Sequence, residues 1–188
     1  MTVARGGLLE DELFALLQPL SRASFSALAH SLRPYLAAGD ASLMVFFHAS
    51  FADATTRRYL GSSATIAAAH AHLAAYFESA LAAAASSAAA APAELARAGA
   101  ELVYHLVHAG NVDALEHLLT SLAFVHARAA SGTLRALVTD YRLVLATLSS
   151  VPQSLHDFAH FVSSAAHLLA AQPVSILQLA SNAPYASA

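Results

Sequence analysis

The stretch SLMVFFHASFADATTRRYL, residues 42–60, holds the most specific pattern in the chain. Five consecutive apolar residues open it, at positions 43–47, and they include a valine and two phenylalanines. A short apolar run of this composition predicts a buried strand. His48 follows the run directly, so the sequence places a histidine at the end of a strand.

A helix is expected immediately after this histidine. Ser50 and Asp53 have the spacing of a capping box, in which each side chain satisfies the backbone amide of the other residue. The helix would begin at about Phe51 and stop at Gly61, and two arginines in its last turn suit the helix dipole. The whole stretch therefore predicts a strand, a histidine and a helix in succession.

The residues before this stretch predict two helices and a weak second strand. Leucines at helical spacing from Leu8 onward, with acids in the first turn, indicate a first helix that ends near Pro19. Ser24 can cap a second helix, which Pro34 would kink or end. The order helix, helix, turn, strand and helix indicates a winged-helix-like domain over residues 1–62.

Two short features complete this N-terminal module. Gly39-Asp40 predicts a turn, and Tyr35 to Ala38 is a weak candidate for the strand that must pair with residues 43–47. Beyond the module, residues 63–93 are expected to form a connecting helix over 64–80 and an alanine-rich linker, for which a helix extension is the alternative.

Residues 94–188 are expected to form a helical arm. Apolar stripes at helical spacing predict successive helices, with breaks at Gly110-Asn111, at 131–133 and at Pro152. The apolar stripe of Leu115, Leu118, Leu119, Leu122 and Val125 indicates one helix between the first two breaks. Ser154 with Asp157 predicts a second capping box. Short loops between such helices favour antiparallel neighbours, so the fold class is mainly α, with a bundle or a short α-solenoid after the N-terminal module.

Composition excludes several functional classes. Hydrophobic residues make up 57% of the 188 residues and charged residues 11%, which argues against disorder, and the net charge of −3 argues against a nucleic-acid surface. There is no cysteine, so disulfides and thiolate metal sites are excluded. Neither a signal peptide nor a membrane span is predicted. We expect a cytoplasmic protein.

No pattern in the sequence supports catalysis. The glycines do not form a phosphate-binding loop, and no nucleophile motif is present. His105 with His108, and His156 with His160, have spacings that could ligate zinc, but a zinc site needs three or four converging ligands. We expect no metal and no enzyme activity. His48 differs by its position next to a helix N-terminus, where an anion is favoured. The alternative, which the pattern alone favours, is that it caps the junction through a backbone carbonyl.

Several stretches resemble the region between the nucleotide-binding domain and the WD40 propeller of STAND-class NTPases, namely NACHT/WD-repeat, telomerase-associated and nephrocystin-like proteins. They occur in the order that the family has them. They are GGLLEDELFALL (6–17), SLRPYL (31–36), FFHASFADATTRRYL (46–60), AHAHLAAYF (69–77), AELVYHLVHAGNVDALEHLLTSLAFVHARAASG (100–132), LVTDYRLVL (137–145), LHDFAHFVSSAAHLL (155–169) and ILQLASNAP (176–184).

The resemblance implies a winged-helix domain and a helical arm, without the family's P-loop, and hence an incomplete gene product or a domain-only fragment. His48 matches the histidine that contacts the β-phosphate of ADP in the closed state of related NTPases. ADP or ATP is therefore implied only together with an upstream nucleotide-binding domain. The remaining residues are assigned structural roles, Ser50 and Asp53 as the capping pair and the matched arm positions as packing and turn residues. These arm positions are Tyr104, His105, Gly110, Phe124, Gly132, Asp140 and Tyr141.

These observations favour a non-catalytic regulatory segment that couples nucleotide state to an effector or a WD-repeat sensor. Its partners would be the nucleotide-binding and WD-repeat domains of a parent or related protein, with no nucleic acid and no membrane. The alternative is a free-standing α-helical scaffold that binds a partner peptide in a groove. Winged-helix DNA binding is a weak third reading, because the second helix offers only His30 and Arg33 to a nucleic acid.

Overall fold

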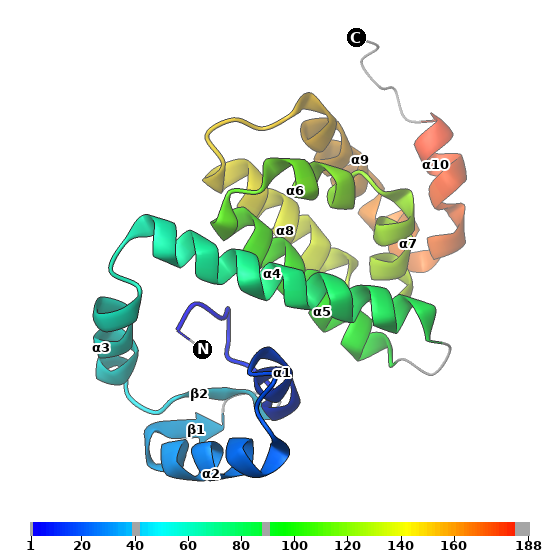
Figure 1. Cartoon of the computed structure of the whole chain (residues 1–188). Helices are drawn as coiled ribbons and strands as arrows, with labels where there is room; N and C mark the ends of the chain where they lie inside the picture. The colour runs from blue at the N-terminus through cyan, green and yellow to red at the C-terminus, as the bar shows by residue number, and fades with distance from the viewer. Residues whose placement is uncertain (1, 39–41, 88–90, 183–188) are drawn as a thin grey trace. The chain divides into compact units, whose positions relative to one another are not determined.

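The computed structural model of the chain describes residues 2–38, 42–87 and 91–182 (Figure 1). Within these ranges the chain is mainly helical, as the sequence predicts, with one two-stranded antiparallel sheet. It divides into two compact units, Met1–His70 and Ala71–Ala188, and the division falls inside helix α4, Ser63–Ser86. The expected domain limits of 1–62, 63–93 and 94–188 stay predictions.

The first unit begins with α1, Glu10–Leu16, and α2, Arg22–Leu32. The side chain that caps α2 is Ser21 and not Ser24 as predicted, because the Ser21 hydroxyl lies three residues before the Ser24 amide and accepts its hydrogen bond at 3.1 Å. Pro34 ends the α-helix as predicted, and the chain continues through a single 3₁₀ turn.

The small sheet pairs β1, Leu36–Ala38, with β2, Met44–Phe46. Leu36 lies opposite Phe46, and Ala38 lies opposite Met44. Both the strand predicted within 43–47 and its weak partner near 35–38 are confirmed, although the side chains of β2 are half-buried and not fully buried. The predicted turn at Gly39-Asp40 lies outside the described residues, and the winged-helix arrangement stays a prediction.

Leu8 adds a further link to β2. Its backbone exchanges two hydrogen bonds with Met44, at 3.3 Å and 2.7 Å. Gly7 makes this approach possible, because a Cβ atom at position 7 would lie 2.6 Å from the Met44 carbonyl oxygen. The N-terminal segment is therefore held against the strand that leads to His48.

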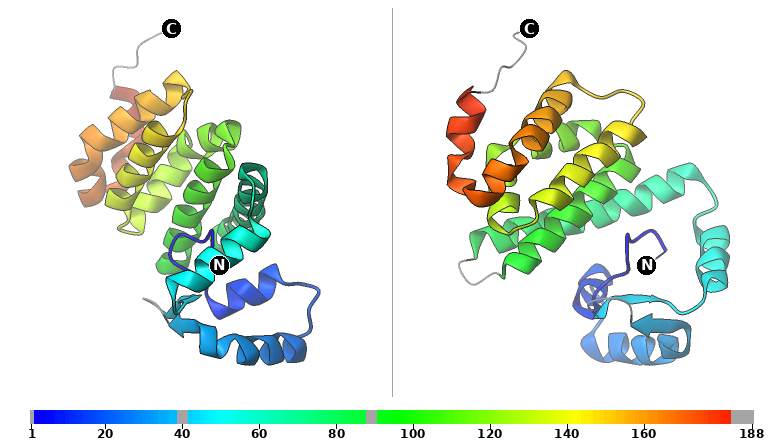
Figure 2. Two further views of the ribbon diagram at one scale, coloured as in Figure 1. Left: turned by 90° about the vertical axis from the view of Figure 1, so that its left-hand side faces the viewer. Right: turned by 180° about the vertical axis from the view of Figure 1, so that it is seen from behind.

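The second unit contains α5 to α10 after the C-terminal part of α4. The bounds of these helices are α5, Pro92–Ala109; α6, Val112–Leu119; α7, Leu122–Ala130; α8, Leu134–Thr147; α9, Gln153–Ala171; and α10, Ile176–Asn182. A 3₁₀ turn at Pro173–Ser175 precedes α10. Figure 2 shows α8 between α5 and α9, and these two pairs of helices make the most extensive contacts in the unit.

Two local predictions in this unit are wrong. The single helix expected over the apolar stripe from Leu115 to Val125 is two helices, because Ser121 accepts a hydrogen bond from the Phe124 amide and starts α7. The capping box at Ser154 and Asp157 is absent, because α9 begins at Gln153 and the Ser154 hydroxyl donates to the Glu116 carboxylate on α6. A local serine cap therefore divides the first predicted helix, whereas a long-range hydrogen bond occupies the serine of the second prediction.

The core of the second unit consists of aliphatic side chains that face one another across the helices. Its most deeply buried members are Val103, Leu115, Leu119, Val125, Leu137, Val144, Leu155, Val162 and Leu169. In the part of the chain that the structure describes, no helix is both long and apolar enough to cross a membrane.

Candidate functional site

His48 lies between β2 and α3, Ala49–Tyr59, at the position that caps the helix N-terminus. Its backbone is extended, with φ −127° and ψ 134°, and the side chain is exposed. The Nδ1 atom lies 3.0 Å from the Ser50 hydroxyl oxygen, which orients the ring at the start of the helix. An exposed imidazole beside free helix amides can contact an anionic group that approaches this end of α3.

The predicted capping box at Ser50 and Asp53 is not formed. The helix starts two residues before Phe51, so Ser50 lies inside its first turn, where its hydroxyl faces His48 and does not cap a backbone amide. The Asp53 side chain is exposed. Ser50 is therefore the partner of the histidine and not the cap of the helix.

Two contacts fasten this junction to the preceding segment. The Phe47 amide donates to the Tyr35 carbonyl oxygen at 2.9 Å, and the rings of Tyr35 and Phe51 meet edge to face with their centroids 4.9 Å apart. Phe47 itself is 70% exposed beside His48. The position of His48 is thus set by backbone bonding on the strand side and by an aromatic pair on the helix side.

The other residues singled out from the sequence lie in the second unit. Tyr104 and His105 are on α5, Phe124 is on α7, and Asp140 and Tyr141 are on α8. The two glycines end helices with left-handed backbones, Gly110 at φ 71° and Gly132 at φ 72°. All seven residues belong to the second unit, whereas His48 belongs to the first.

His105 is fully buried inside this unit. Its ring stacks on Phe77 of α4 at 5.7 Å between centroids, and Nε2 lies 3.7 Å from a carboxylate oxygen of Glu101 one turn earlier. Arg97 approaches the other oxygen of Glu101 at 3.8 Å. The ring of Tyr104 meets His105 edge to face with the centroids 5.2 Å apart, and it meets His108 with the centroids 4.4 Å apart.

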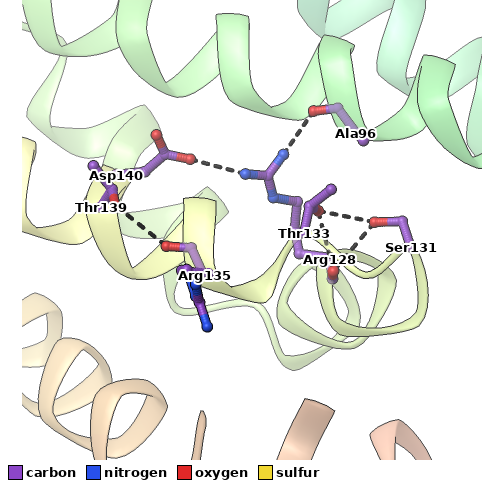
Figure 3. Close-up of polar contacts among 7 residues, drawn as sticks. All are labelled: Ala96, Arg128, Ser131, Thr133, Arg135, Thr139 and Asp140. Carbon is purple, nitrogen blue, oxygen red and sulfur yellow. Dashed lines mark hydrogen bonds and ion pairs between the residues drawn. The ribbon is translucent and has the colours of Figure 1, made fainter.

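A buried ion pair connects three helices of the same unit (Figure 3). Arg128 of α7 donates through Nη2 to Asp140 of α8 at 3.0 Å and through Nη1 to the Ala96 carbonyl oxygen of α5 at 2.6 Å. The side chains of Arg128 and Asp140 are 2% and 1% exposed. Because the charges are paired and hydrogen-bonded, their burial is tolerated and the three helices are held in register.

Two further contacts reinforce the packing around this pair. The Tyr141 hydroxyl donates to the Leu119 carbonyl oxygen at 2.6 Å, and burial raises the pKa of this phenol well above its usual range. Phe124 packs on Gly99 of α5, where a Cβ atom would lie 3.1 Å from the Phe124 ring. The geometry of Asp140, Tyr141 and Phe124 is that of interior packing.

Sequence reasoning missed Arg128, the central residue of this cluster. A signal was present, because Arg128 and Asp140 are the only two opposite charges that face the interior stripes of α7 and α8 in the described core. A charged residue in an otherwise apolar stripe is a candidate for a buried pair. Placing each charged residue on a helical wheel would have shown that Arg128 lies on the apolar face of its helix.

The described residues hold no group of three or more His, Cys, Asp and Glu side chains that could bind a metal ion. Of the histidines with zinc-like spacing, His105 is buried, whereas His108, His156 and His160 are exposed.

The second unit is defined by its geometry as a helical domain with a buried polar cluster. Residues 99–188 match the family model described as the APAF-1 helical domain. This part of the chain is therefore similar to a helical region of STAND-type NTPases. Searches of the curated proteins and of the solved structures gave no match.

Proposed function

We propose that this chain is a non-catalytic regulatory segment of a STAND-type NTPase, in which the second unit is the helical arm. The observation that carries the proposal is the match of residues 99–188 to the APAF-1 helical domain. The first unit supports it, because a strand ends two residues before His48 and a helix follows directly after it. The ordered motifs that resemble NACHT/WD-repeat and nephrocystin-like proteins extend the likeness to the rest of the chain.

His48 is the candidate nucleotide-sensing residue in this proposal. Its exposed imidazole and the amides at the start of α3 can contact a phosphate that a separate nucleotide-binding domain presents. One side chain cannot bind ADP with useful affinity, so the contact matters only as a difference between the ADP-bound and the ADP-free state of that domain. The arm would transmit this difference to an effector or to a WD-repeat domain.

The second candidate function is a helical scaffold that binds a partner peptide independently of any nucleotide. The grooves on the surface of the second unit favour it, including an apolar one beside Leu122, Ile176 and Leu177. In that case His48 would have no effect on partner binding, which separates the two functions experimentally.

The test is the release of fluorescent ADP from a nucleotide-binding domain of an APAF-1-type NTPase, with and without the chain. We expect the wild-type chain to slow ADP release. With His48→Ala, release should be roughly tenfold faster than with the wild-type chain, because the variant loses one hydrogen bond to a charged group. His30→Ala changes another exposed histidine of the same unit and should behave as the wild type.

Release that is unchanged by saturating wild-type chain would overturn the coupling. Equal slowing by the wild type and His48→Ala would assign the effect to the arm alone. The chain without the added domain should show no thermal shift with ADP or ATP, and a shift that His48→Ala abolishes would mean that the chain holds a nucleotide site of its own.

A further inference from the structure

A groove of about 440 Å³ runs between α8 and α9 of the second unit. Its floor includes Leu134, which is buried, and Val138, which is half-buried. Arg135 and Arg142 stand on the α8 side of the groove and are exposed. The groove therefore combines an aliphatic floor with two cationic side chains on one wall.

The opposite wall belongs to α9 and is low. Ser163, Ala166 and Ala170 face the groove at intervals of three and four residues, so they lie on one side of the helix. His167 is the only large side chain on this wall among the described lining residues. Short side chains allow the backbone of another helix to approach closely.

The charge of the groove contrasts with that of the unit around it. Residues 71–188 contain seven Asp and Glu residues but four Arg residues. Two of these arginines contact carboxylates inside the unit, Arg97 near Glu101 and Arg128 on Asp140. The other two line the groove, where no acidic side chain occurs among the described residues.

Arg135 is directed away from the structural ion pair. Figure 3 shows Arg128 and Asp140 on one side of α8 and Arg135 pointing from the other side. Among the described residues, neither Arg135 nor Arg142 forms an ion pair. Their charges are thus available to a ligand without loss of a contact that stabilises the fold.

The spacing of the arginines favours an elongated ligand. Arg142 lies seven positions after Arg135 on α8, which places their backbones about 10.5 Å apart along one face of the helix. Carboxylates two turns apart on a second helix match this distance directly. A single phosphate would require both guanidinium groups to converge on the midpoint, above the aliphatic floor.

We propose that the groove between α8 and α9 binds an acidic amphipathic helix of a partner protein. Two carboxylates of that helix pair with Arg135 and Arg142, and an apolar side chain between them rests on Leu134 and Val138. Guanidinium groups suit carboxylates because they can donate two parallel hydrogen bonds. The inference makes no use of His48, so the ADP-release experiment leaves it unchanged.

The test is a selection with the purified full chain from a library of random helical peptides about five turns long. We expect the enriched peptides to carry Asp or Glu two turns apart with an apolar residue between them. Fluorescence anisotropy then measures their affinity for the wild type and for Arg135→Gln/Arg142→Gln. The double variant should bind roughly tenfold more weakly, because two exposed ion pairs are lost, and the difference should shrink in high salt.

Arg57→Gln/Arg58→Gln is the matched control, because it removes two exposed arginines of α3 and the same total charge. It should bind the peptides like the wild type. Ala170→Trp fills the exposed low wall of the groove and should also block binding, with circular dichroism to verify the fold of each variant.

The proposal would be overturned if the enriched peptides were not acidic. It would also be overturned if no enriched peptide depended on Arg135 and Arg142 for binding. Equal weakening by both double variants would overturn it too, since the effect would then be net charge. A further experiment measures binding of the chain to vesicles of phosphatidylserine and phosphatidylcholine. Binding to these vesicles through Arg135 and Arg142 without selection of acidic helices would assign the groove to a membrane surface and reject the helix.

Discussion

At the scale of single residues, the strongest constraint is the pair of Arg128 and Asp140. Arg128→Met leaves a carboxylate that is 1% exposed without its partner and removes the donor to the Ala96 carbonyl oxygen. We expect the free energy of unfolding to fall by about 3–5 kcal/mol. Urea denaturation followed by circular dichroism measures the loss.

The double variant Arg128→Met/Asp140→Leu separates the pair from its parts. It also removes the buried Asp140 carboxylate, so it should be more stable than Arg128→Met by about 2 kcal/mol. Arg135→Met is the control on the exposed side of α8 and should change stability by about 0.5 kcal/mol or less. If the double variant were as unstable as the single one, burial of the carboxylate without Arg128 would not be the cause.

Tyr141 makes stability depend on alkaline pH. Burial raises the pKa of its phenol above the unfolded value of about 10, so the folded state favours the protonated form. Its contribution to stability is fully present below about pH 10 and is lost as pH rises toward the folded pKa. Denaturation midpoints measured from neutral pH to above pH 10 should fall less steeply for Tyr141→Phe than for the wild type.

Tyr141→Phe also loses the hydrogen bond to Leu119, so at neutral pH we expect a loss of about 1 kcal/mol. Tyr59→Phe changes a tyrosine that is 69% exposed and should leave the alkaline slope as it is in the wild type. Identical slopes for Tyr141→Phe and the wild type would mean that another group is responsible for the alkaline loss.

At the scale of elements, the turn between α5 and α6 depends on a glycine. Gly110 has φ 71°, and a Cβ atom there would meet no atom within 4 Å. The cost of Gly110→Ala is therefore that of the backbone alone, about 1 kcal/mol. Thermal unfolding should show it, and Gly110→Asn should recover part of the loss, because Asn tolerates the left-handed region better.

The sequence predicted elements well where local chemistry decides them. The strand before His48, the helix end at Gly110 and the Asn111 cap, which accepts from the Ala114 amide at 3.1 Å, all follow from short patterns. It failed at Ser121 and Ser154, because a hydroxyl can cap a helix or bond elsewhere and only the tertiary structure decides which. The helical phase of Arg128 marks it as inward-facing, but its pairing with Asp140 depends on how α7 packs against α8, which local patterns do not give.

The candidate site was predictable only in part. The position of His48 between a strand and a helix follows from the sequence, whereas its contact with Ser50 depends on where the helix begins. The groove of Arg135 and Arg142 was not foreseen, because each arginine alone is an ordinary exposed residue. The two arginines form one wall of a groove only because α9 places small side chains opposite them, and this packing is not visible in the sequence.

At the scale of the whole molecule, α4 belongs to both compact units. Its N-terminal part lies in the first unit. Its C-terminal part lies in the second, where Leu73, Ala74 and Phe77 are buried and the Phe77 ring stacks on His105. A helix that is shared in this way cannot be cut at the unit boundary without loss of its own cap, since the Ser62 hydroxyl accepts from the Thr65 amide.

We therefore expect the fragment 62–188 to fold with one cooperative unfolding transition, whereas the fragment 79–188 should be much less stable. The shorter fragment loses Leu73 and the ring of Phe77 that covers His105. In the full chain, Phe77→Ala alone should cost about 3–5 kcal/mol, and Tyr76→Ala, at a half-buried neighbouring position, should cost less. Urea unfolding of both fragments and both variants measures these differences. Equal stability of the two fragments would show that α4 adds nothing to the second unit, and the stacking of Phe77 on His105 would then carry no part of its stability.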